Sequence, residues 1–219
     1  MIRTRINPSY RSDERKHQHN TLRGYLSLVP AGVLTASCLW TGSVLAGFDE
    51  GMAAYSRGEY EIAADEWHPL AIQGDRIAQH HLGWLYLLGH GVPQDDKEAL
   101  HWFQKAAEQG DTDAQTNLGG LYLLGDRVPQ NTTAALAWFH AAAAEGNIAA
   151  QIKLGIMYED GHGVPQDPIQ AYMWFALAAT NGDVLAKAFQ EALGREMTAV
   201  QIAEGQRLAQ EWKAKTHKP

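Results

Sequence analysis

The sequence predicts an all-α protein in which similar helix pairs stack one on another to form a solenoid. The main observation is a set of motifs that recur every 36 residues in the 219-residue chain. A fixed period of this length indicates stacked supersecondary units. The recurring motifs are a glycine before Asp or Asn (Gly74, Gly110, Gly146, Gly182), Leu-Gly (Leu82, Leu118, Leu154), Tyr (Tyr86, Tyr122, Tyr158), Val-Pro-Gln (Val92, Val128, Val164) and Trp-Phe (Trp102, Trp138, Trp174).

The second observation is that each unit contains the start and stop signals of a first helix. In the first unit, Asp75 is a good N-cap, and apolar residues follow at helical spacing from Ala78 to Tyr86. Residues 89–94 include two glycines and a proline, which cannot continue a helix and predict a connector. We therefore expect the first helix to begin after Asp75 and to end at about Leu88.

The third observation is a matching set of signals for a second helix. Asp95 is its expected N-cap, and Glu98 stands three residues on, which predicts a capping box. Trp102 and Phe103 belong to its apolar stripe, and Gly110 is expected to close the helix in the left-handed conformation. Two helices and their connector thus fill one period.

Three glycines stand within the first helices, where each lowers the stability of the helix by roughly 1 kcal/mol relative to alanine. This recurring cost at Gly83, Gly119 and Gly155 indicates a close approach between helices. We expect the neighbours to be the tryptophan rings of the second helices or their paired alanines. The tryptophans are interpreted as core residues between units and not as a stripe that stacks a ligand.

The recurring residues resemble the Sel1-like repeat, a relative of the tetratricopeptide repeat. The matching string is Ala-x-x-x-Leu-Gly-x-x-Tyr, then Gly-x-Gly-Val, then Ala-x-x-Trp-Phe-x-x-Ala-Ala-x-x-Gly, and it occurs three times. The resemblance implies a right-handed α-solenoid of Sel1-like, tetratricopeptide-like helix pairs. The expected organisation is three repeats at 75–110, 111–146 and 147–182 (75–182 together), a capping helix pair at 47–74, and capping helices with a tail at 183–219.

One position departs from the repeat pattern. Arg127 stands where the other units have Gly91 and Gly163. If this position needs a positive φ, a non-glycine residue is unfavourable there. The middle connector is then expected to be strained or differently shaped.

Residues 1–46 are interpreted as a targeting segment. Six of them are basic and two are acidic, and an uncharged stretch runs from Gly24 to Phe48. Small residues before Gly47 favour a cleaved secretory signal peptide, whereas the apolar length also fits an uncleaved membrane anchor. In both cases the basic flank predicts that the solenoid lies outside the inner membrane.

The composition of residues 47–219 argues against several classes of function. They hold 12 basic and 23 acidic residues, so nonspecific nucleic-acid binding is not expected. The only cysteine, Cys38, precedes this region, and the histidines show no HExxH spacing. We predict no metal site, no cofactor and no catalytic residue. Some cysteine-rich Sel1-like proteins are linked to β-lactam binding or hydrolysis, but their paired cysteines are absent here.

A partner-binding groove is expected on the concave side. In tetratricopeptide-like arrays this surface is lined by first-helix residues at fixed offsets from the Leu-Gly pair. Trp84 is the expected hot spot, and Glu159 with Asp160 gives the mainly apolar groove an acidic end. The alternative is that Leu88 and Leu124 turn inward and only half of the positions are exposed. The predicted groove consists of His80, Trp84, Leu87, Thr116, Gly120, Leu123, Ile152, Ile156 and Glu159.

The predicted function is a non-catalytic protein–protein interaction scaffold or adaptor, exported to the bacterial cell envelope, that binds a protein or peptide in the groove. The targeting segment predicts a periplasmic or secreted protein, with membrane contact only through an uncleaved N-terminal segment. Two alternatives stay open. One is an exported hydrolase of envelope material, such as peptidoglycan or a β-lactam, although the sequence offers no nucleophile–base pair. The other is a secreted factor that meets a host protein.

Overall fold

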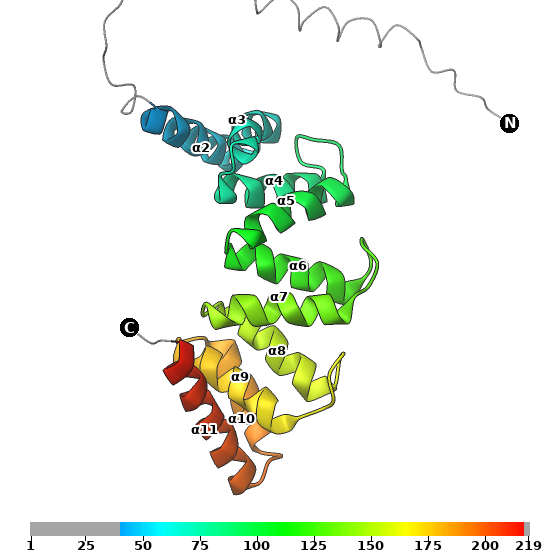
Figure 1. The fold of residues 1–219 in the computed structure, drawn as a ribbon, viewed down its shortest axis with the longest axis vertical. Helices are drawn as coiled ribbons and strands as arrows, with labels where there is room; N and C mark the ends of the chain where they lie inside the picture. Colours follow the sequence, from blue (N-terminus) through cyan, green and yellow to red (C-terminus); the bar gives the residue numbers. More distant parts are fainter. Residues whose placement is uncertain (1–39, 217–219) are drawn as a thin grey trace, which may run out of the picture. The chain divides into compact units, whose positions relative to one another are not determined.

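Residues 40–216 are described by the computed structural model, and they form ten α-helices and no β-strand (Figure 1). The helices follow one another along a single stack, from α2 at one end to α10 and α11 at the other. The predicted all-α solenoid is confirmed. The helices are α2 (Trp40–Ser56), α3 (Tyr60–Ile72), α4 (Arg76–Leu88), α5 (Asp96–Glu108), α6 (Thr112–Leu124), α7 (Thr132–Ala144), α8 (Ile148–Asp160), α9 (Pro168–Thr180), α10 (Val184–Gly194) and α11 (Ala199–Thr216).

The helices pack as consecutive pairs. In each repeat the two helices lie against each other, α4 on α5, α6 on α7 and α8 on α9, and the second helix of one repeat contacts the first helix of the next. Each of these repeat helices has 13 residues, so the sequence period is kept in the structure. Because each repeat contacts mainly its neighbours, stability is spread over the interfaces between units.

The predicted helix caps are confirmed, with one exception. The Asp75 carboxylate accepts a hydrogen bond from the Ala78 amide at 2.8 Å. The Asp95 carboxylate likewise accepts from the Glu98 amide at 3.2 Å. The reciprocal bond of the predicted capping box, from the Asp95 N–H to the Glu98 side chain, is wrong. The Asp95 N–H donates instead to the Tyr86 carbonyl at 3.1 Å, because the connector folds back on the first helix. The equivalent bonds run from Asn131 to Tyr122 and from Asp167 to Tyr158.

The helical glycines approach phenylalanine rings and not the expected tryptophans. A Cβ at Gly119 would lie 2.5 Å from Cε1 of Phe139, which is fully buried. The predicted close approach is confirmed, and its predicted partner is wrong. Adjacent residues of a helix point about 100° apart, so Phe139 and Trp138 cannot both face one glycine. The same contact joins Gly83 to Phe103 and Gly155 to Phe175.

The three tryptophans of the repeat differ in burial. Trp102 and Trp174 are buried, whereas Trp138 is half-buried. Trp174 packs edge-on against Trp212 of α11, with ring centroids 4.7 Å apart. The three repeat tryptophans belong to three separate apolar clusters, so they do not form a common stacking surface.

The middle connector makes different contacts at the position of Arg127, and whether it is strained or differently shaped stays a prediction. A Cβ at Gly91 would lie 2.2 Å from the Tyr60 carbonyl carbon, and Gly91 has a φ of +72°, so glycine is required there. At the equivalent place, the Arg127 guanidinium bonds to Asp96 Oδ1 at 2.9 Å and to the Leu87 carbonyl at 3.1 Å. A salt bridge to the preceding repeat thus stands where the first connector makes a close backbone contact.

The N-terminal helices precede the first repeat. Helix α2 runs through the expected cleavage site after Ala46, and most of the predicted targeting segment lies outside the described residues. Helices α2 and α3 pair with each other, and α3 contacts α4. Trp67 is fully buried at this end, 6.2 Å from the Phe48 ring. Within 40–216 we find no helix that is long and apolar enough to span a membrane.

The C-terminal helices α10 and α11 both pack on α9. Phe189 of α10 stacks on Phe175, with ring centroids 5.2 Å apart. The capping box predicted at the start of α11 is present: the Thr198 N–H donates to Gln201 Oε1 at 2.9 Å, and the Gln201 N–H donates to Thr198 Oγ1 at 3.3 Å. These helices cover the apolar end of the third repeat.

Candidate partner-binding surface

The predicted groove positions lie on the first helices of the three repeats, α4, α6 and α8. All but Leu87 are partly exposed, so their side chains can reach a partner. A surface formed by one helix from each repeat continues along the stack, because the repeats follow one another in order. The partly exposed positions are His80, Trp84, Thr116, Gly120, Leu123, Ile152, Ile156 and Glu159.

Leu87 does not belong to this surface. It is 7% exposed and packs in one cluster with Phe103 and Leu118, so its assignment to the groove is wrong. The next residue, Leu88, is 45% exposed, and Leu124 is 71% exposed. The alternative in which these two leucines turn inward is therefore also wrong. Adjacent side chains of a helix point about 100° apart, so Leu87 can be buried while Leu88 is exposed.

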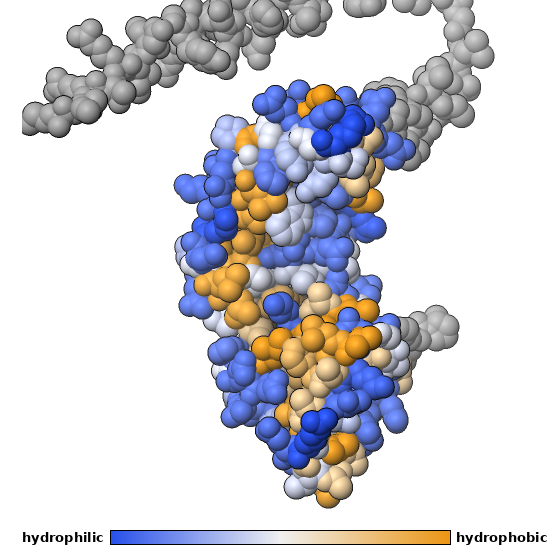
Figure 2. Space-filling model, turned by 180° about the vertical axis from the view of Figure 1, so that it is seen from behind, coloured by the Kyte–Doolittle hydropathy of each residue, from blue (hydrophilic) through white to orange (hydrophobic). Residues whose placement is uncertain are grey.

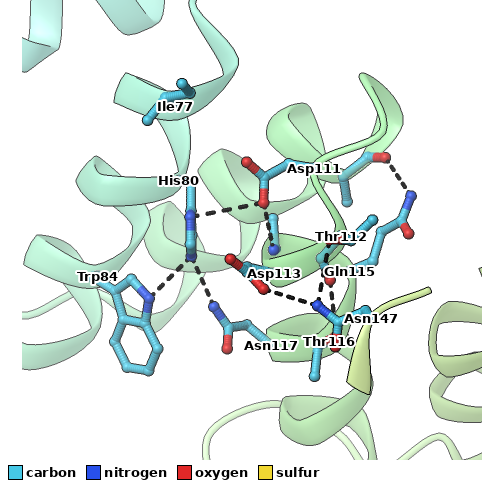
Figure 3. Close-up of polar contacts among 12 residues, drawn as sticks. Ile77, His80, Trp84, Asp111, Thr112, Asp113, Gln115, Thr116, Asn117 and Asn147 are labelled. Atoms are coloured by element: carbon cyan, nitrogen blue, oxygen red, sulfur yellow. Dashed lines mark hydrogen bonds and ion pairs between the residues drawn. The ribbon is translucent and has the colours of Figure 1, made fainter. Parts of the chain in front are cut away.

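His80 is the centre of a hydrogen-bond network that joins α4 to α6 (Figure 3). Trp84 Nε1 donates to His80 Nε2 at 3.1 Å, and Asn117 Nδ2 lies 3.0 Å from the same nitrogen. On the other side of the ring, His80 Nδ1 lies 3.7 Å from Oδ1 of Asp111, the N-cap of α6. Because two donors converge on Nε2, the neutral ring carries its proton on Nδ1, where it faces the carboxylate.

Burial favours the neutral form of this histidine. It lowers the pKa of His80, and the Asp111 and Asp113 carboxylates oppose the shift with a smaller effect. The pKa of His81 is lowered by burial and by the neighbouring His80. Since the accepting nitrogen of His80 is already used by two donors, this residue holds Trp84 in position and is poorly placed to act as a general base.

The Trp84 indole is fixed from two sides. Its N–H is bonded to His80, and its ring meets the Phe103 ring edge-on, with centroids 5.6 Å apart and an interplanar angle of 84°. The side chain is nevertheless only half-buried. An aromatic ring that is ordered before binding loses little freedom when a partner covers it.

The second repeat offers open space at the equivalent position. Gly120 stands one period after Trp84, and a Cβ there would meet no described atom within 4 Å beyond the adjacent backbone of α6. The Thr116 hydroxyl donates to the Thr112 carbonyl at 2.8 Å, so its proton is used within α6. The surface therefore changes from an aromatic ring to a gap over one repeat.

The third repeat presents two isoleucines and an acidic end. Ile152 and Ile156 pack partly against the cluster that contains Phe175. Glu159 is partly buried, and its pKa is raised by burial and by the nearby Asp160 carboxylate. Apolar and acidic side chains thus share this end of the surface.

Apolar residues do not form one continuous stripe on the face seen in Figure 2. They gather in separate patches that hydrophilic residues divide. Along the predicted groove, α6 contributes Thr116 and Gly120 as well as the apolar Leu123, between Trp84 of α4 and the two isoleucines of α8. We conclude that the candidate surface is mixed in character.

Three buried glutamines were not predicted, although they also recur every 36 residues. Each lies in a first helix, is at most 7% exposed, and donates from Nε2 to a carbonyl near the end of the preceding second helix. Their polar type suggests a surface position, and only the period could have indicated a fixed structural role. The pairs are Gln79 with Ala71, Gln115 with Ala107 and Gln151 with Ala143.

The comparisons with known proteins agree with this geometry. The family model described as Sel1 repeat matches residues 76–111, 112–147 and 148–183. A Sel1 repeat protein from Oxalobacter formigenes, known from a crystal structure, is 38% identical in sequence to this chain. The match covers 58% of this chain and 96% of that chain, with a TM-score of 0.54. The chain belongs to the Sel1-repeat family. The predicted resemblance is confirmed, with repeat boundaries one residue later than expected.

Two other similar proteins match less closely. A protective antigen of uropathogenic Escherichia coli with an SLR fold is 28% identical, with 80% of this chain and 46% of that chain covered at a TM-score of 0.49. F-box protein At1g70590 of Arabidopsis thaliana is 37% identical over 67 residues, which are 31% of this chain and 18% of that protein. The Sel1-repeat chain therefore matches less than a fifth of this curated relative.

Sel1-repeat proteins generally mediate protein–protein interaction and act as non-catalytic scaffolds. The described residues 40–216 contain no group of three or more His, Cys, Asp or Glu side chains placed to hold a metal ion. The partly exposed residues of α4, α6 and α8 are accordingly the candidate site, and a protein partner is the class of ligand that suits it.

Proposed function

We propose that this Sel1-repeat protein is an adaptor of the bacterial cell envelope that binds a protein or peptide along α4, α6 and α8. The observation that carries the proposal is Trp84, which is half-buried and fixed by His80 and Phe103. Fixed aromatic rings of this kind are frequent hot spots of protein interfaces. The gap at Gly120, one repeat on, leaves room for a side chain of the partner.

Export is supported by the sequence of residues 1–46, in which a basic start precedes an uncharged apolar stretch. A fusion of residues 1–50, which include the expected cleavage site after Ala46, to mature alkaline phosphatase tests the proposal, because the enzyme is active only after export. We expect phosphatase activity in the periplasm and N-terminal sequencing that begins at Gly47. An inactive fusion that stays in the cytoplasm would contradict export, and an active, uncleaved fusion in the membrane would support the anchor.

Photo-crosslinking in cells tests the binding surface. A benzoylphenylalanine at Gly120 would extend into open space, and Lys105, exposed on α5, provides a matched control position. We expect a protein to be captured from Gly120 and not from Lys105, and mass spectrometry would identify it. Equal capture from both positions would indicate that α6 is not the binding surface.

The identified protein then allows a quantitative test with purified components. Trp84→Ala is expected to weaken its binding by about tenfold or more, because hot-spot residues contribute about 2 kcal/mol or more. Lys105→Ala is the control and should bind as the wild type does. Isothermal titration measures the affinities, and thermal melts show whether each variant is folded. Unchanged affinity in a folded Trp84→Ala variant would refute the role of this ring.

A further inference from the structure

The first repeat satisfies both hydrogen-bonding groups of its buried glutamine. Gln79 is 2% exposed, and its Nε2 donates to the Ala71 carbonyl at 2.9 Å. Its Oε1 accepts from Gln109 Nε2 at 2.8 Å, and Gln109 stands directly after α5. The amide nitrogen and the amide oxygen therefore each have a partner within the protein, as buried amides normally do.

In the second repeat, the equivalent glutamine oxygen has no donor within residues 40–216. Gln115, which stands 36 residues later, donates in the same way to the Ala107 carbonyl at 3.0 Å. The place of Gln109 is taken by Glu145, whose carboxylate accepts hydrogen bonds and cannot donate one. Gln115 is only 7% exposed, and its Oε1 has no donor in the described part of the chain. A buried acceptor without a partner costs about 1–3 kcal/mol, so a donor from outside would be stabilised there.

Gln115 and Glu145 line one open hollow of about 850 Å³ at the ends of α4, α6 and α7. In the first repeat the equivalent glutamine oxygen accepts from Gln109, and Glu145 is the residue at the place of Gln109 in the second repeat. Asp111 and Asp113, near the start of α6, add two carboxylates to the lining (Figure 3). These three acidic residues outnumber the single basic one in the described lining, Arg76, and the hollow is negatively charged.

The other residues of the hollow agree with a cationic ligand. Burial lowers the pKa values of His80 and His81, which favours the neutral form of both rings. Ile77, which is 44% exposed, and Ala144 provide apolar surface beside the acidic groups. A cation with an apolar stem would therefore find both of its parts matched.

We propose that this hollow binds an arginine side chain of a protein partner, with the guanidinium donating to Gln115 Oε1 and to the Glu145 carboxylate. A guanidinium suits the site because its N–H groups form a planar fork that can serve two acceptors at once. The stem of the arginine lies along Ile77. The inference rests on the proposed function, since it names the group of the partner that this surface recognises.

The third repeat shows that a buried glutamine oxygen without a donor does not by itself make a cation site. Gln151 Oε1 also lacks a donor among the described residues, and Asn181 stands at the place of Gln109. The hollow that contains Gln151 and Asn181 is lined by Lys213 and, as far as the structure describes it, by no carboxylate. An arginine is therefore expected at the second repeat and not at the third.

NMR titration of the full-length protein with N-acetyl-arginine amide tests the proposal. We expect saturable shifts of the Gln115 side-chain amide signal and of the backbone amides around Glu145. N-acetyl-citrulline amide has the same shape without the charge, and we expect its affinity to be lower by about tenfold or more. N-acetyl-lysine amide is expected to bind more weakly than the arginine probe. Equal binding of citrulline would overturn the cation site, and equal binding of lysine would overturn the guanidinium assignment.

Matched substitutions at repeat-equivalent positions complete the test. Glu145→Gln copies the neutral pair of the first repeat, and we expect it to weaken binding of the arginine probe by about tenfold or more. Gln109→Ala, at the equivalent position of the first repeat, is the control and should leave the affinity unchanged. The amide spectrum of each variant shows whether it is folded. Wild-type affinity in a folded Glu145→Gln variant would overturn the proposal.

The arginine site and the adaptor function can fail separately. If the probe binds as expected but crosslinking at Gly120 captures no protein, the arginine site stands and the adaptor function is contradicted. If a partner is captured at Gly120 while the probe gives no shifts at Gln115, the adaptor function stands and the arginine site is overturned.

Discussion

The first and second repeats are nearly alike in the core and differ along one edge. In both, a fully buried phenylalanine, Phe103 or Phe139, lies against a helical glycine. At the edge, the first repeat pairs its buried glutamine with Gln109, whereas the second repeat has Glu145 in that place. The comparison shows that packing constrains the interior closely, because each phenylalanine ring leaves no room for a Cβ on the glycine that it faces. Polar groups at the edge can change while the helices keep their arrangement.

The largest expected effect tests the shared core. Phe139→Ala should lower the free energy of unfolding by about 3–5 kcal/mol, because it removes a fully buried ring. Trp138→Ala should lower it by less, about 1–2 kcal/mol, because this ring is half-buried. Urea denaturation followed by circular dichroism measures both changes. Phe103→Ala is the control and should match Phe139→Ala. A larger loss in Trp138→Ala would mean that the tryptophan carries the interface.

The next effect concerns the glycine that faces this ring. Gly119→Ala places a Cβ 2.5 Å from Phe139, and overpacking of this kind costs about 1–3 kcal/mol. The better helix propensity of alanine returns about 1 kcal/mol, so we expect a net loss of about 1–2 kcal/mol. Gly120→Ala is a control one residue away, where the Cβ meets no described atom within 4 Å and should stabilise the protein. The same urea melts would contradict this account if both variants gained stability.

Much of the fold could be predicted from the sequence because the period and the caps are local signals. The position of Asp75 before an apolar, helix-periodic segment was enough to place the start of α4. The partner of Gly119 was predicted incorrectly, because Trp138 and Phe139 are adjacent and both recur with the period. Only the rotation of α7 about its axis decides between them, and that rotation is set by packing between helices.

Exchanging the edge residues of the two repeats is expected to have a moderate effect. Glu145→Gln would place a donor near the unpaired Gln115 oxygen, and we expect stabilisation by about 1 kcal/mol. Gln109→Glu makes the reverse change in the first repeat, where Gln79 loses its donor, and a similar loss is expected. Chemical denaturation of both variants measures the changes. A loss of stability in Glu145→Gln would indicate that bound water already satisfies the Gln115 oxygen.

The candidate surface was less predictable than the fold. Offsets from the Leu-Gly pair place most positions on the exposed side of the first helices, but they wrongly include Leu87, which is buried. The network around His80 includes Asn117, which is 37 residues away in the sequence. Contacts of this kind join non-identical residues of successive repeats, and a period describes only what the repeats share. The open acceptor of Gln115 could be recognised only from the missing donor in the structure.

The smallest effect is expected at the middle connector. Arg127→Gly introduces the residue of the other two connectors and removes the bonds to Asp96 and to the Leu87 carbonyl. The paired side chains are 34% and 35% exposed, so water and salt screen the interaction, and we expect a loss of about 0.5 kcal/mol. A double-mutant cycle with Asp96→Asn isolates the coupling between the two side chains. A coupling energy near zero would show that the connector does not depend on the salt bridge.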